Sequence, residues 1–313
     1  MTRPSVVVLG AAGFIGRHVV QALARHGCNV LGLGHGNWEQ SEWSKWGLAR
    51  WINADIGADS LNHLVAEEIP RCVVHCGGSG AVSFSYAQPL EDFQRATHST
   101  AVVLDWIRLR WPEACRFVLV SSAAVYGDQG DSDVTENSVR SPISPYGVHK
   151  VAAEALCESY SRFFGVSSSV VRLFSVYGEG LRKQLLWDAL NKFNSGQNHF
   201  FGTGNEMRDW IHVEDAGALL ALAGLAQQPS FEVYNGGFEH ASTRDVLARL
   251  GLACGHAGGV VFNGETHKGN PRRLTSESGH ARRLLNWEPK IRVEEGLRRY
   301  AEWFKAQGEP AAG

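Results

Sequence analysis

Short aliphatic runs alternate with segments of helical periodicity through the first half of this 313-residue chain. Val-, Ile- and Leu-rich runs predict strands, and these occupy residues 5–10, 29–34, 49–56, 72–78, 116–122 and 167–178. Apolar residues at helical spacing predict helices, and these occupy residues 14–26, 60–69, 90–110 and 147–164. Continuous aliphatic strands joined by crossover helices predict an α/β fold, a Rossmann-type doubly wound parallel sheet covered on both faces.

The pattern changes beyond about residue 175, where Gly, Asn and charged residues become more frequent and the strand-like runs shorten. We therefore predict a dinucleotide-binding domain over residues 1–174 and a smaller α/β region over 175–305 that binds the substrate, with an interleaved boundary. Residues 306–313, "AQGEPAAG", have the composition of a disordered tail.

Composition excludes several classes of function. Lys plus Arg number 30 against 32 for Asp plus Glu, so no field of one sign favours nucleic acid or anionic lipid as a partner. No apolar run approaches the roughly 18 residues of a spanning helix. The six cysteines are irregularly spaced, which indicates reduced thiols and a cytoplasmic protein. Cys72, His75 and Cys76 are interpreted as buried strand residues, and no metal site is predicted.

Three glycines follow the first predicted strand directly. Gly10 permits a tight turn, Gly13 lets the backbone approach a pyrophosphate, and Gly16 allows close packing of helix on strand. The helix that starts at Phe14 and Ile15 presents free N–H groups to such a phosphate. The spacing is G-x-x-G-x-x-G, and its place between a strand and a helix predicts a dinucleotide site.

The end of the second predicted strand lacks the acidic residue that normally holds the adenosine ribose. Gly34 stands at that place and His35 follows, which favours NADP over NAD, although no arginine is near in the sequence. Asp55, followed by Ile56, is placed to accept a bond from the adenine amino group, or it is a turn aspartate. Tyr146 and Lys150 complete the predicted cofactor contacts.

A second motif predicts acid–base chemistry. Tyr146 and Lys150 are four residues apart on a predicted helix and therefore share a face. A lysine ammonium favours the phenolate, which lowers the pKa of a tyrosine toward a useful value. Ser122, at the end of a predicted strand, can bond the same substrate oxygen. Ser122, Tyr146 and Lys150 are the predicted catalytic residues.

Five segments, "GAAGFIG", "SSAAVYG", "PYGVHK", "RLFSVYG" and "RDWIHVEDA", together resemble the extended short-chain dehydrogenase/reductases that modify nucleotide sugars, the NAD-dependent epimerase/dehydratase family. The resemblance spans about residues 5–305. It implies a Rossmann domain that binds NAD(P), a smaller domain that binds a nucleoside-diphosphate sugar, and Ser, Tyr and Lys acting at C4 of the sugar.

The resemblance also implies substrate contacts. Arg208 matches the arginine that contacts the diphosphate, with an ion pair to Asp209 or Glu214 as the structural alternative. Ser175 stands where the family commonly has asparagine. Lys183 is a further expected contact, or a solvated helix charge.

Several positions depart from the family pattern. Ala123 and Ala124 replace the acidic pair of the 4,6-dehydratases, which argues against that reaction. His267 and Asn270 replace the R and D of an R-x-G-D segment, and Arg272 is expected to supply the second diphosphate contact or to be a surface charge.

Two enzymatic interpretations remain. A 4-keto-6-deoxy-sugar reductase is narrowly favoured because Gly34 points to NADPH, and a 4-epimerase with tightly bound NAD is the alternative. A non-catalytic nucleotide sensor on a Rossmann frame is a third. The resemblance further implies a homodimer through helices 90–110 and 147–164, with Trp106, Ala153 and Leu156 at the seam or in the core.

Overall fold

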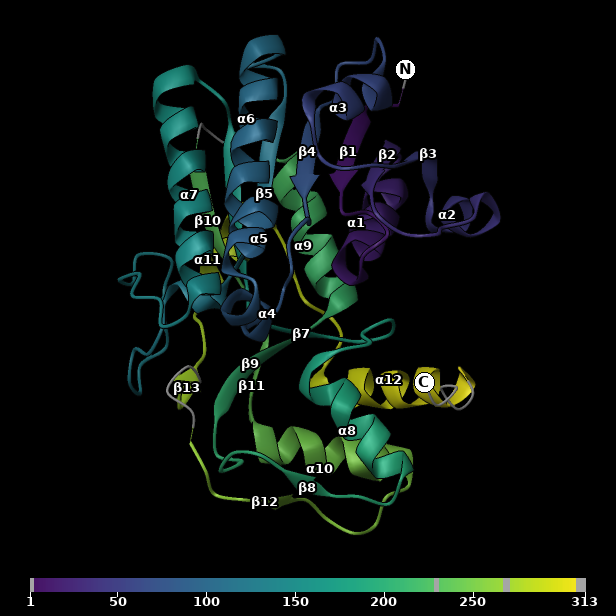
Figure 1. The fold of residues 1–313 in the computed structure, drawn as a ribbon, viewed down its shortest axis with the longest axis vertical. Coiled ribbons are helices and arrows are strands. Elements are labelled where there is room, and N and C mark those ends of the chain that lie inside the picture. The colour runs from purple at the N-terminus through teal and green to yellow at the C-terminus, as the bar shows by residue number, and fades with distance from the viewer. Residues whose placement is uncertain (1–2, 228–230, 267–270, 308–313) are drawn as a thin grey trace.

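The computed structural model describes residues 3–227, 231–266 and 271–307. Its main sheet has seven parallel strands in the order β10-β6-β5-β4-β1-β2-β3 (Figure 1). The strands are β1 (Ser5–Leu9), β2 (Asn29–Gly34), β3 (Leu48–Asn53), β4 (Cys72–His75), β5 (Arg116–Ser122), β6 (Ser168–Leu173) and β10 (Phe231–Gly236). The strand order reverses between β1 and β4, and in such sheets ligands bind at the carboxyl ends beside this reversal.

Helices cover both faces of this sheet, which explains its uninterrupted aliphatic strands. One face packs against α1 (Phe14–Arg25), α9 (Val213–Leu225) and α11 (Gly279–Leu285). The other packs against α3 (Ala58–Val65), α6 (Ser99–Arg110) and α7 (Pro145–Phe164). The predicted Rossmann-type fold is confirmed.

Three predicted elements differ from the structure. The predicted strand 167–178 is two strands, because β6 stays in the large sheet and β7 (Ser175–Tyr177) joins a second one. The predicted strand 49–56 ends at Asn53, so Asp55 lies in a loop. The predicted helix 90–110 consists of α5 (Pro89–Phe93), a π-helical turn (Gln94–His98) and α6. Two short helices, α2 (Gln40–Trp46) and α4 (Val82–Ala87), were not predicted from the sequence.

The smaller part of the molecule lies below the carboxyl edge of the large sheet in Figure 1. A second sheet pairs β9 (Met207–His212) with β7, β11 (Glu239–Ser242) and β13 (Arg273–Leu274), and β8 (His199–Phe200) pairs with β12 (Val261–Phe262). These strands pack with α8 (Gln184–Asn194), α10 (Thr243–Cys254) and α12 (Val293–Ala306).

The chain crosses between the two parts more than once. After β9 it returns to the large sheet as α9 and β10, so a single cut at residue 174 does not separate the two sheets. At the carboxyl end, Ala306 is still helical and the side chain of Gln307 accepts a bond from Arg182, so the predicted tail does not begin at 306. Residues 308–313 lie outside the described residues, as do His267 and Asn270. Within the described chain, no helix is long and apolar enough to cross a bilayer.

Candidate active site

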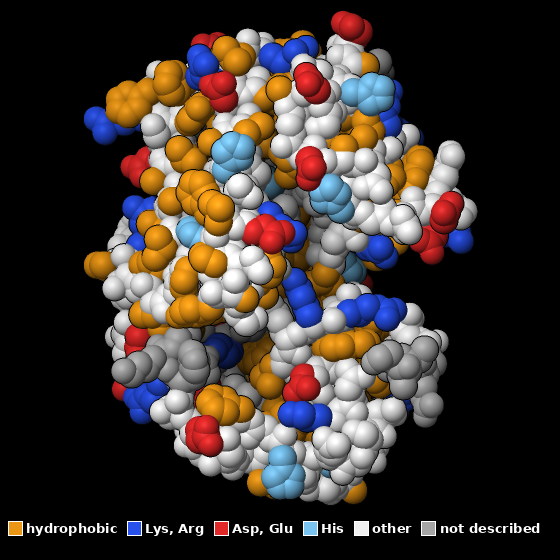
Figure 2. All heavy atoms as spheres, viewed as in Figure 1, with side chains coloured by type: hydrophobic (Ala, Val, Ile, Leu, Met, Phe, Trp, Pro, Cys, Tyr) orange, Lys and Arg blue, Asp and Glu red, His pale blue; other side chains and the backbone are white. Residues whose placement is uncertain are grey.

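A cavity of about 830 Å³ lies between the carboxyl edge of the large sheet and the smaller part of the molecule. Figure 2 shows the molecule hollowed between these two parts, with basic side chains near the opening. Most of the predicted site residues line this cavity, namely Gly10, Gly13, Phe14, Ile15, Gly16, Ser122, Tyr146, Lys150, Ser175, Lys183 and Arg208. The topology therefore brings together residues that are far apart in the sequence.

The glycine loop between β1 and α1 fits a dinucleotide. Gly10 has a φ of +74°, and a Cβ there would lie 3.0–3.2 Å from the backbone of Cys76 and Gly77. A Cβ at Gly16 would lie 2.1 Å from the carbonyl oxygen of Gly10, so no other residue fits there without moving the backbone. The loop thus keeps its backbone bare where α1 begins, and free N–H groups at a helix start bind phosphate.

The outer end of the predicted cofactor site is arranged differently from expectation. Gly34, His35, Asp55 and Ile56 are not among the described residues that line the cavity. The imidazole of His35 lies 2.8 Å from the Asp55 carboxylate, and both side chains are exposed. The predicted role of Asp55 toward the adenine ring stays a prediction.

An arginine that is distant in the sequence lies beside the loop that follows β2. The Arg17 guanidinium lies 4.8 Å from the ring centre of Trp38, and its Nε donates to the carbonyl of Ala12 at 2.8 Å. Ala12 packs beside Gly36, two residues beyond the end of β2. The position of Arg17 is not predictable from sequence spacing, because this residue lies in α1, on a different element from Gly34.

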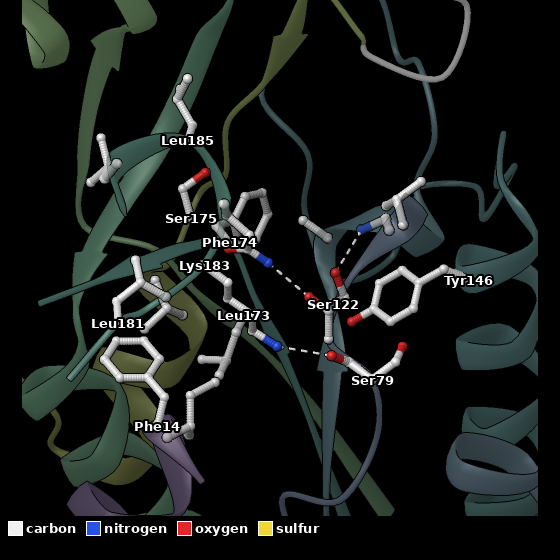
Figure 3. A pocket seen from close by; sticks show the side chains of 18 of the residues that line it. Phe14, Ser79, Ser122, Tyr146, Leu173, Phe174, Ser175, Leu181, Lys183 and Leu185 are labelled. Atoms are coloured by element: carbon white, nitrogen blue, oxygen red, sulfur yellow. Dashed lines mark hydrogen bonds between the residues drawn. The ribbon is translucent and has the colours of Figure 1, made fainter. Parts of the chain in front are cut away.

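The predicted catalytic residues come from β5 and α7. Ser122 ends β5 and lies in the same cavity wall as Tyr146, as Figure 3 shows. Two features stabilise the N-terminus of α7. The Ser144 side chain accepts a hydrogen bond from the N–H of Gly147, and Pro145 occupies the first helical position. A Cβ at Gly147 would lie 2.6 Å from the carbonyl oxygen of Ala124, so this glycine lets α7 approach the end of β5 closely.

Burial dominates the electrostatics of this pair. It raises the pKa of Tyr146 to about 12, against an opposing effect of the hydrogen bond with Ser122, while the charge of Asp92 raises the pKa further. Burial also lowers the pKa of Lys150. The Lys150 Nζ donates to the carbonyl of Val120 at 2.8 Å and lies 5.9 Å from the ring centre of Tyr146. The expected lowering of the Tyr146 pKa by Lys150 is therefore not observed, and burial sets the direction of the shift.

Basic side chains enter the cavity from the smaller part of the molecule. Burial lowers the pKa of Lys183, whose Nζ donates to the carbonyl of Ser79 at 2.9 Å across the cleft. Arg208 also lines the cavity, and one of its nitrogens donates to the carbonyl of Met207 at 2.7 Å. Arg272 does not line it, because its exposed guanidinium pairs with Asp131 on the surface. The predicted diphosphate contact of Arg272 is therefore not supported.

The alternative partners considered for Arg208 are bound elsewhere. One Asp209 oxygen accepts from the N–H of Phe238 at 2.6 Å, and the other accepts from the hydroxyl and N–H of Ser276 at 2.6 and 3.1 Å. Glu214 pairs with Arg299. The alternative interpretation, an ion pair of Arg208 with Asp209 or Glu214, is therefore not supported.

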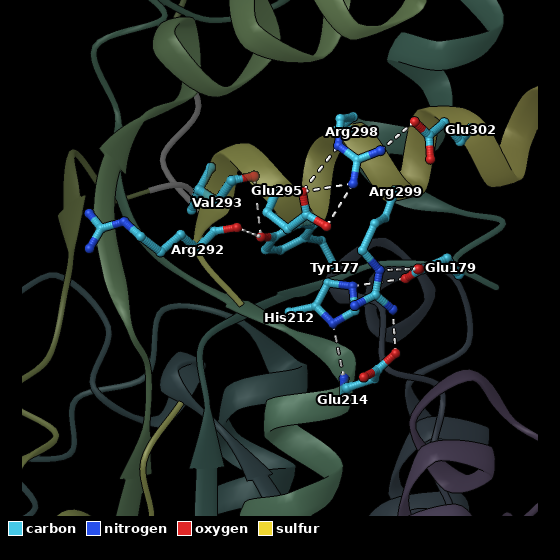
Figure 4. A network of polar contacts seen from close by, with 10 residues as sticks. All are labelled: Tyr177, Glu179, His212, Glu214, Arg292, Val293, Glu295, Arg298, Arg299 and Glu302. Carbon is cyan, nitrogen blue, oxygen red and sulfur yellow. Dashed lines mark hydrogen bonds and ion pairs between the residues drawn. The ribbon is translucent and has the colours of Figure 1, made fainter. Parts of the chain in front are cut away.

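A polar network fixes the chain next to the cleft (Figure 4). Glu179 accepts from His212 at 2.8 Å and from Arg299 at 2.7 Å, and Arg299 also pairs with Glu214. Burial alone would raise the pKa of Glu179, but these bonds lower that pKa to about 2. Glu179, His212 and Glu214 have the donor atoms of a metal site, but Arg299 already neutralises both carboxylates. The network ties α12 and the start of α9 to the segment that leads to Lys183.

Comparison with known proteins agrees with this geometry. The chain matches the NAD dependent epimerase/dehydratase family over residues 6–237. It is 27% identical to a UDP-glucuronate 4-epimerase of Thermodesulfobacterium geofontis, over 96% of this chain and 95% of that protein. A crystal structure of a UDP-glucose 4-epimerase with UDP-glucose from Thermotoga maritima superposes with a TM-score of 0.87 at 25% identity, covering 97% of this chain and all of that one.

A further solved structure, MoeE5 in complex with UDP-glucuronic acid and NAD, is 26% identical with a TM-score of 0.84, covering 97% of this chain and 99% of that chain. The family match covers more than half of the chain, the large sheet is the predicted parallel one, and Ser122, Tyr146 and Lys150 line one cavity. The chain therefore belongs to the NAD-dependent epimerase/dehydratase family of extended short-chain dehydrogenase/reductases.

Proposed function

We propose that this protein is an NAD-dependent 4-epimerase of a nucleoside-diphosphate sugar. The observation that carries the proposal is one cavity lined by the glycine loop, by the Ser122–Tyr146 pair, and by Lys183 and Arg208 of the smaller domain. A dinucleotide on the glycine loop and a sugar diphosphate on the two cations would bring their reacting ends together at Ser122 and Tyr146.

Each polar group has a distinct task in this reaction. A nicotinamide dinucleotide held by the glycine loop would supply reversible hydride transfer at C4 of the sugar. Tyr146 takes the proton of the C4 hydroxyl and gives it back, and Ser122 donates a hydrogen bond to the same oxygen. Burial raises the pKa of Tyr146, and a positive charge bound beside it would act in the opposite direction by favouring the phenolate.

The diphosphate is the natural ligand for the basic side of the cavity. Arg208 offers a planar guanidinium fork, which suits paired phosphate oxygens. Burial lowers its pKa, and the charge of Glu206 acts in the opposite direction. Lys183 adds a second cation whose present partner is a backbone carbonyl. Ser175, beside them on β7, offers a hydroxyl to the sugar or the nucleotide.

Two observations support epimerisation over the other reactions of the family. The related UDP-glucuronate 4-epimerase and UDP-glucose 4-epimerase match this chain along almost their whole lengths. Ala123 and Ala124 follow Ser122 in the cavity wall, and neither offers an acid or a base for the elimination of water. We therefore place the epimerase first, although the sequence alone favoured the reductase.

The reductase remains the second candidate because of one feature of the structure. The end of β2 has no carboxylate at Gly34 to repel a 2′-phosphate, and Arg17 lies close to the same loop. An arginine at that place suits a phosphomonoester. This arrangement favours NADPH as a consumed substrate.

One purification distinguishes the two candidates. The protein is isolated without added nucleotide and denatured, and the released dinucleotide is identified. Near-stoichiometric NAD⁺, together with interconversion of UDP-glucose and UDP-galactose or of the corresponding uronates, supports the epimerase. An empty protein that binds NADPH more tightly than NADH and converts a 4-keto-6-deoxy sugar supports the reductase. A Tyr146→Phe protein with undiminished biological activity would instead support the nucleotide sensor.

We also propose a homodimer, formed through the outer faces of α6 and α7. Of the residues expected at the seam or in the core, Trp106 and Ala153 are buried in the core of the monomer and Leu156 packs partly against it, which supports the core alternative. Exposed apolar side chains occupy the outward faces instead, and they are Leu109, Val148, Phe163 and Phe164. Light scattering at micromolar concentration should give twice the mass of the 34.2 kDa chain, and Phe163→Lys should return it to the monomer mass.

A further inference from the structure

A buried carboxylate lies behind the catalytic tyrosine and has no assigned task. Asp92, in α5, is 0% exposed. Its Oδ1 accepts a hydrogen bond from the Ser79 hydroxyl at 2.5 Å, and its Oδ2 lies 2.6 Å from Nδ1 of His149. Burying a carboxylate is costly unless hydrogen bonds compensate, so both partners stabilise this arrangement.

The two partners of Asp92 belong to the active site. His149 lies in α7 between Tyr146 and Lys150, and its side chain is 15% exposed. Its ring packs edge-on against Phe93, and its carbonyl accepts from the Thr97 hydroxyl at 2.9 Å, so this turn of α7 is held from two directions. The hydrogen bond to Oδ2 of Asp92 therefore comes from an imidazole that is itself held in place by its neighbours.

Ser79 is the single residue with a side chain in the segment Gly77-Gly78-Ser79-Gly80, which lines the cavity after β4. Gly78 and Gly80 have φ values of +139° and +62°, and glycine backbone has much conformational freedom. The Ser79–Asp92 bond is therefore the side-chain anchor of this segment. A Cβ at Gly78 would lie 3.8 Å from the Lys150 Nζ, which shows how close the segment is to the catalytic lysine.

The same segment contacts the opposite side of the cleft. The carbonyl of Ser79 accepts from Lys183 at 2.9 Å, and the carbonyl of Gly80 accepts from the side chain of Gln184 at 2.8 Å. Figure 3 shows Ser79 on the same side of the cavity as Ser122 and Tyr146, with Lys183 reaching toward it. A continuous series of contacts thus runs from His149 through Asp92 and Ser79 to the smaller domain.

We propose that Asp92 and His149 are positioning residues that anchor the segment 77–80 and so set the place of the sugar ring between Tyr146 and Lys183. The inference rests on the proposed function, because it assigns the segment 77–80 to the sugar subsite. It predicts that weakening the anchor loosens this segment and impairs substrate binding more than the chemical step.

Four variants test the anchor. Asp92→Asn removes the charge, Ser79→Ala removes the tether, and His149→Ala removes the bond to Oδ2. His149→Asn is the rescue variant, because its side-chain amide places an N–H close to the position of Nδ1. Glu91→Gln is the matched control, since Glu91 is the neighbouring residue in α5, is part-exposed and pairs with Arg95 rather than with the active site.

Steady-state kinetics with the nucleotide sugar provides the first readout. Ser79→Ala and His149→Ala should raise KM about tenfold, the loss expected for one hydrogen bond to a charged group, and should change kcat less than threefold. Asp92→Asn should raise KM to the same extent, while its kcat also reports the loss of a charge that raises the pKa of Tyr146. His149→Asn should recover most of the loss, and Glu91→Gln should match the parent. A fall in kcat with unchanged KM, or no rescue by His149→Asn, overturns the assignment.

Hydrogen exchange provides a readout that needs no turnover. The peptide that covers residues 77–82 should exchange at least tenfold faster in Asp92→Asn, Ser79→Ala and His149→Ala than in the parent and in Glu91→Gln. If no nucleotide sugar is converted but this peptide loosens, the proposed function fails and the anchor stands. If the parent is an active epimerase and the peptide exchanges equally in all variants, the anchor is refuted.

Discussion

Replacing the buried Glu154 tests whether one ion pair holds the active-site ends of β5 and β6 against α7. Glu154 and Arg172 are 1% and 3% exposed in their side chains. The guanidinium of Arg172 donates to both carboxylate oxygens, at 3.0 and 2.7 Å. The hydroxyl of Ser121, next to Ser122, also donates to Glu154, at 2.5 Å. Burial alone would lower the pKa of Arg172, but the bonds to Glu154 raise it above its ordinary value.

The size of the effect follows from what remains after the substitution. In Glu154→Gln the carboxylate is lost, but the guanidinium of Arg172 stays buried with its charge. Removing one member of a buried pair costs about 3–5 kcal/mol, because the other charge is left uncompensated. Arg172 keeps two further acceptors, the hydroxyl oxygen of Tyr126 and the carbonyl of Glu136, both at 2.8 Å. We therefore expect Glu154→Gln to lower the free energy of unfolding by about 3 kcal/mol, the lower end of that range.

Urea unfolding followed by tryptophan fluorescence measures this loss. The transition midpoint of Glu154→Gln should fall while the slope with denaturant stays that of the parent. Glu158→Gln, one turn further along α7 and exposed, is the control and should change stability by less than about 0.5 kcal/mol. A loss below about 1 kcal/mol in Glu154→Gln would refute the reasoning, because it would mean that Arg172 does not depend on this carboxylate.

Three further outcomes are expected. Gly16→Ala should remove bound dinucleotide, measured as absorbance released on denaturation, because its Cβ would meet the Gly10 carbonyl oxygen at 2.1 Å; full retention would contradict the loop assignment. Arg208→Lys should raise the Kd of a nucleoside-diphosphate sugar in calorimetry about tenfold or more, since lysine lacks the guanidinium fork; an unchanged Kd would remove Arg208 from the substrate site. Burial raises the pKa of Tyr146 and Tyr234 to about 12 each, so the fold favours their neutral form. The stability that these two neutral hydroxyl groups contribute to the folded state is fully present below pH 10 and is lost as the pH rises through 12. The free energy of unfolding should therefore fall over that range, less steeply in Tyr234→Phe.

The sequence by itself determined the family and the fold class, and it supplied the candidate catalytic residues. These features depend on local patterns: aliphatic runs that must be buried on both faces, glycines between strand and helix, and a Tyr and Lys one turn apart. Such patterns lie within one element or its immediate neighbours, so their meaning does not depend on distant parts of the chain. Ser122, Tyr146, Lys150 and the glycine loop accordingly line one cavity, as predicted.

Only the tertiary structure decided which distant side chains meet. Arg17 lies near the end of β2 because α1 packs against that strand, and Arg272 turns to Asp131 because β13 joins the second sheet at the surface. The anchor of residues 77–80 joins side chains from three elements, and no spacing in the sequence predicts Asp92 beside His149, 57 residues away. Hydrogen bonds and ion pairs act over a few ångströms, so chain topology, rather than sequence separation, sets which groups form them.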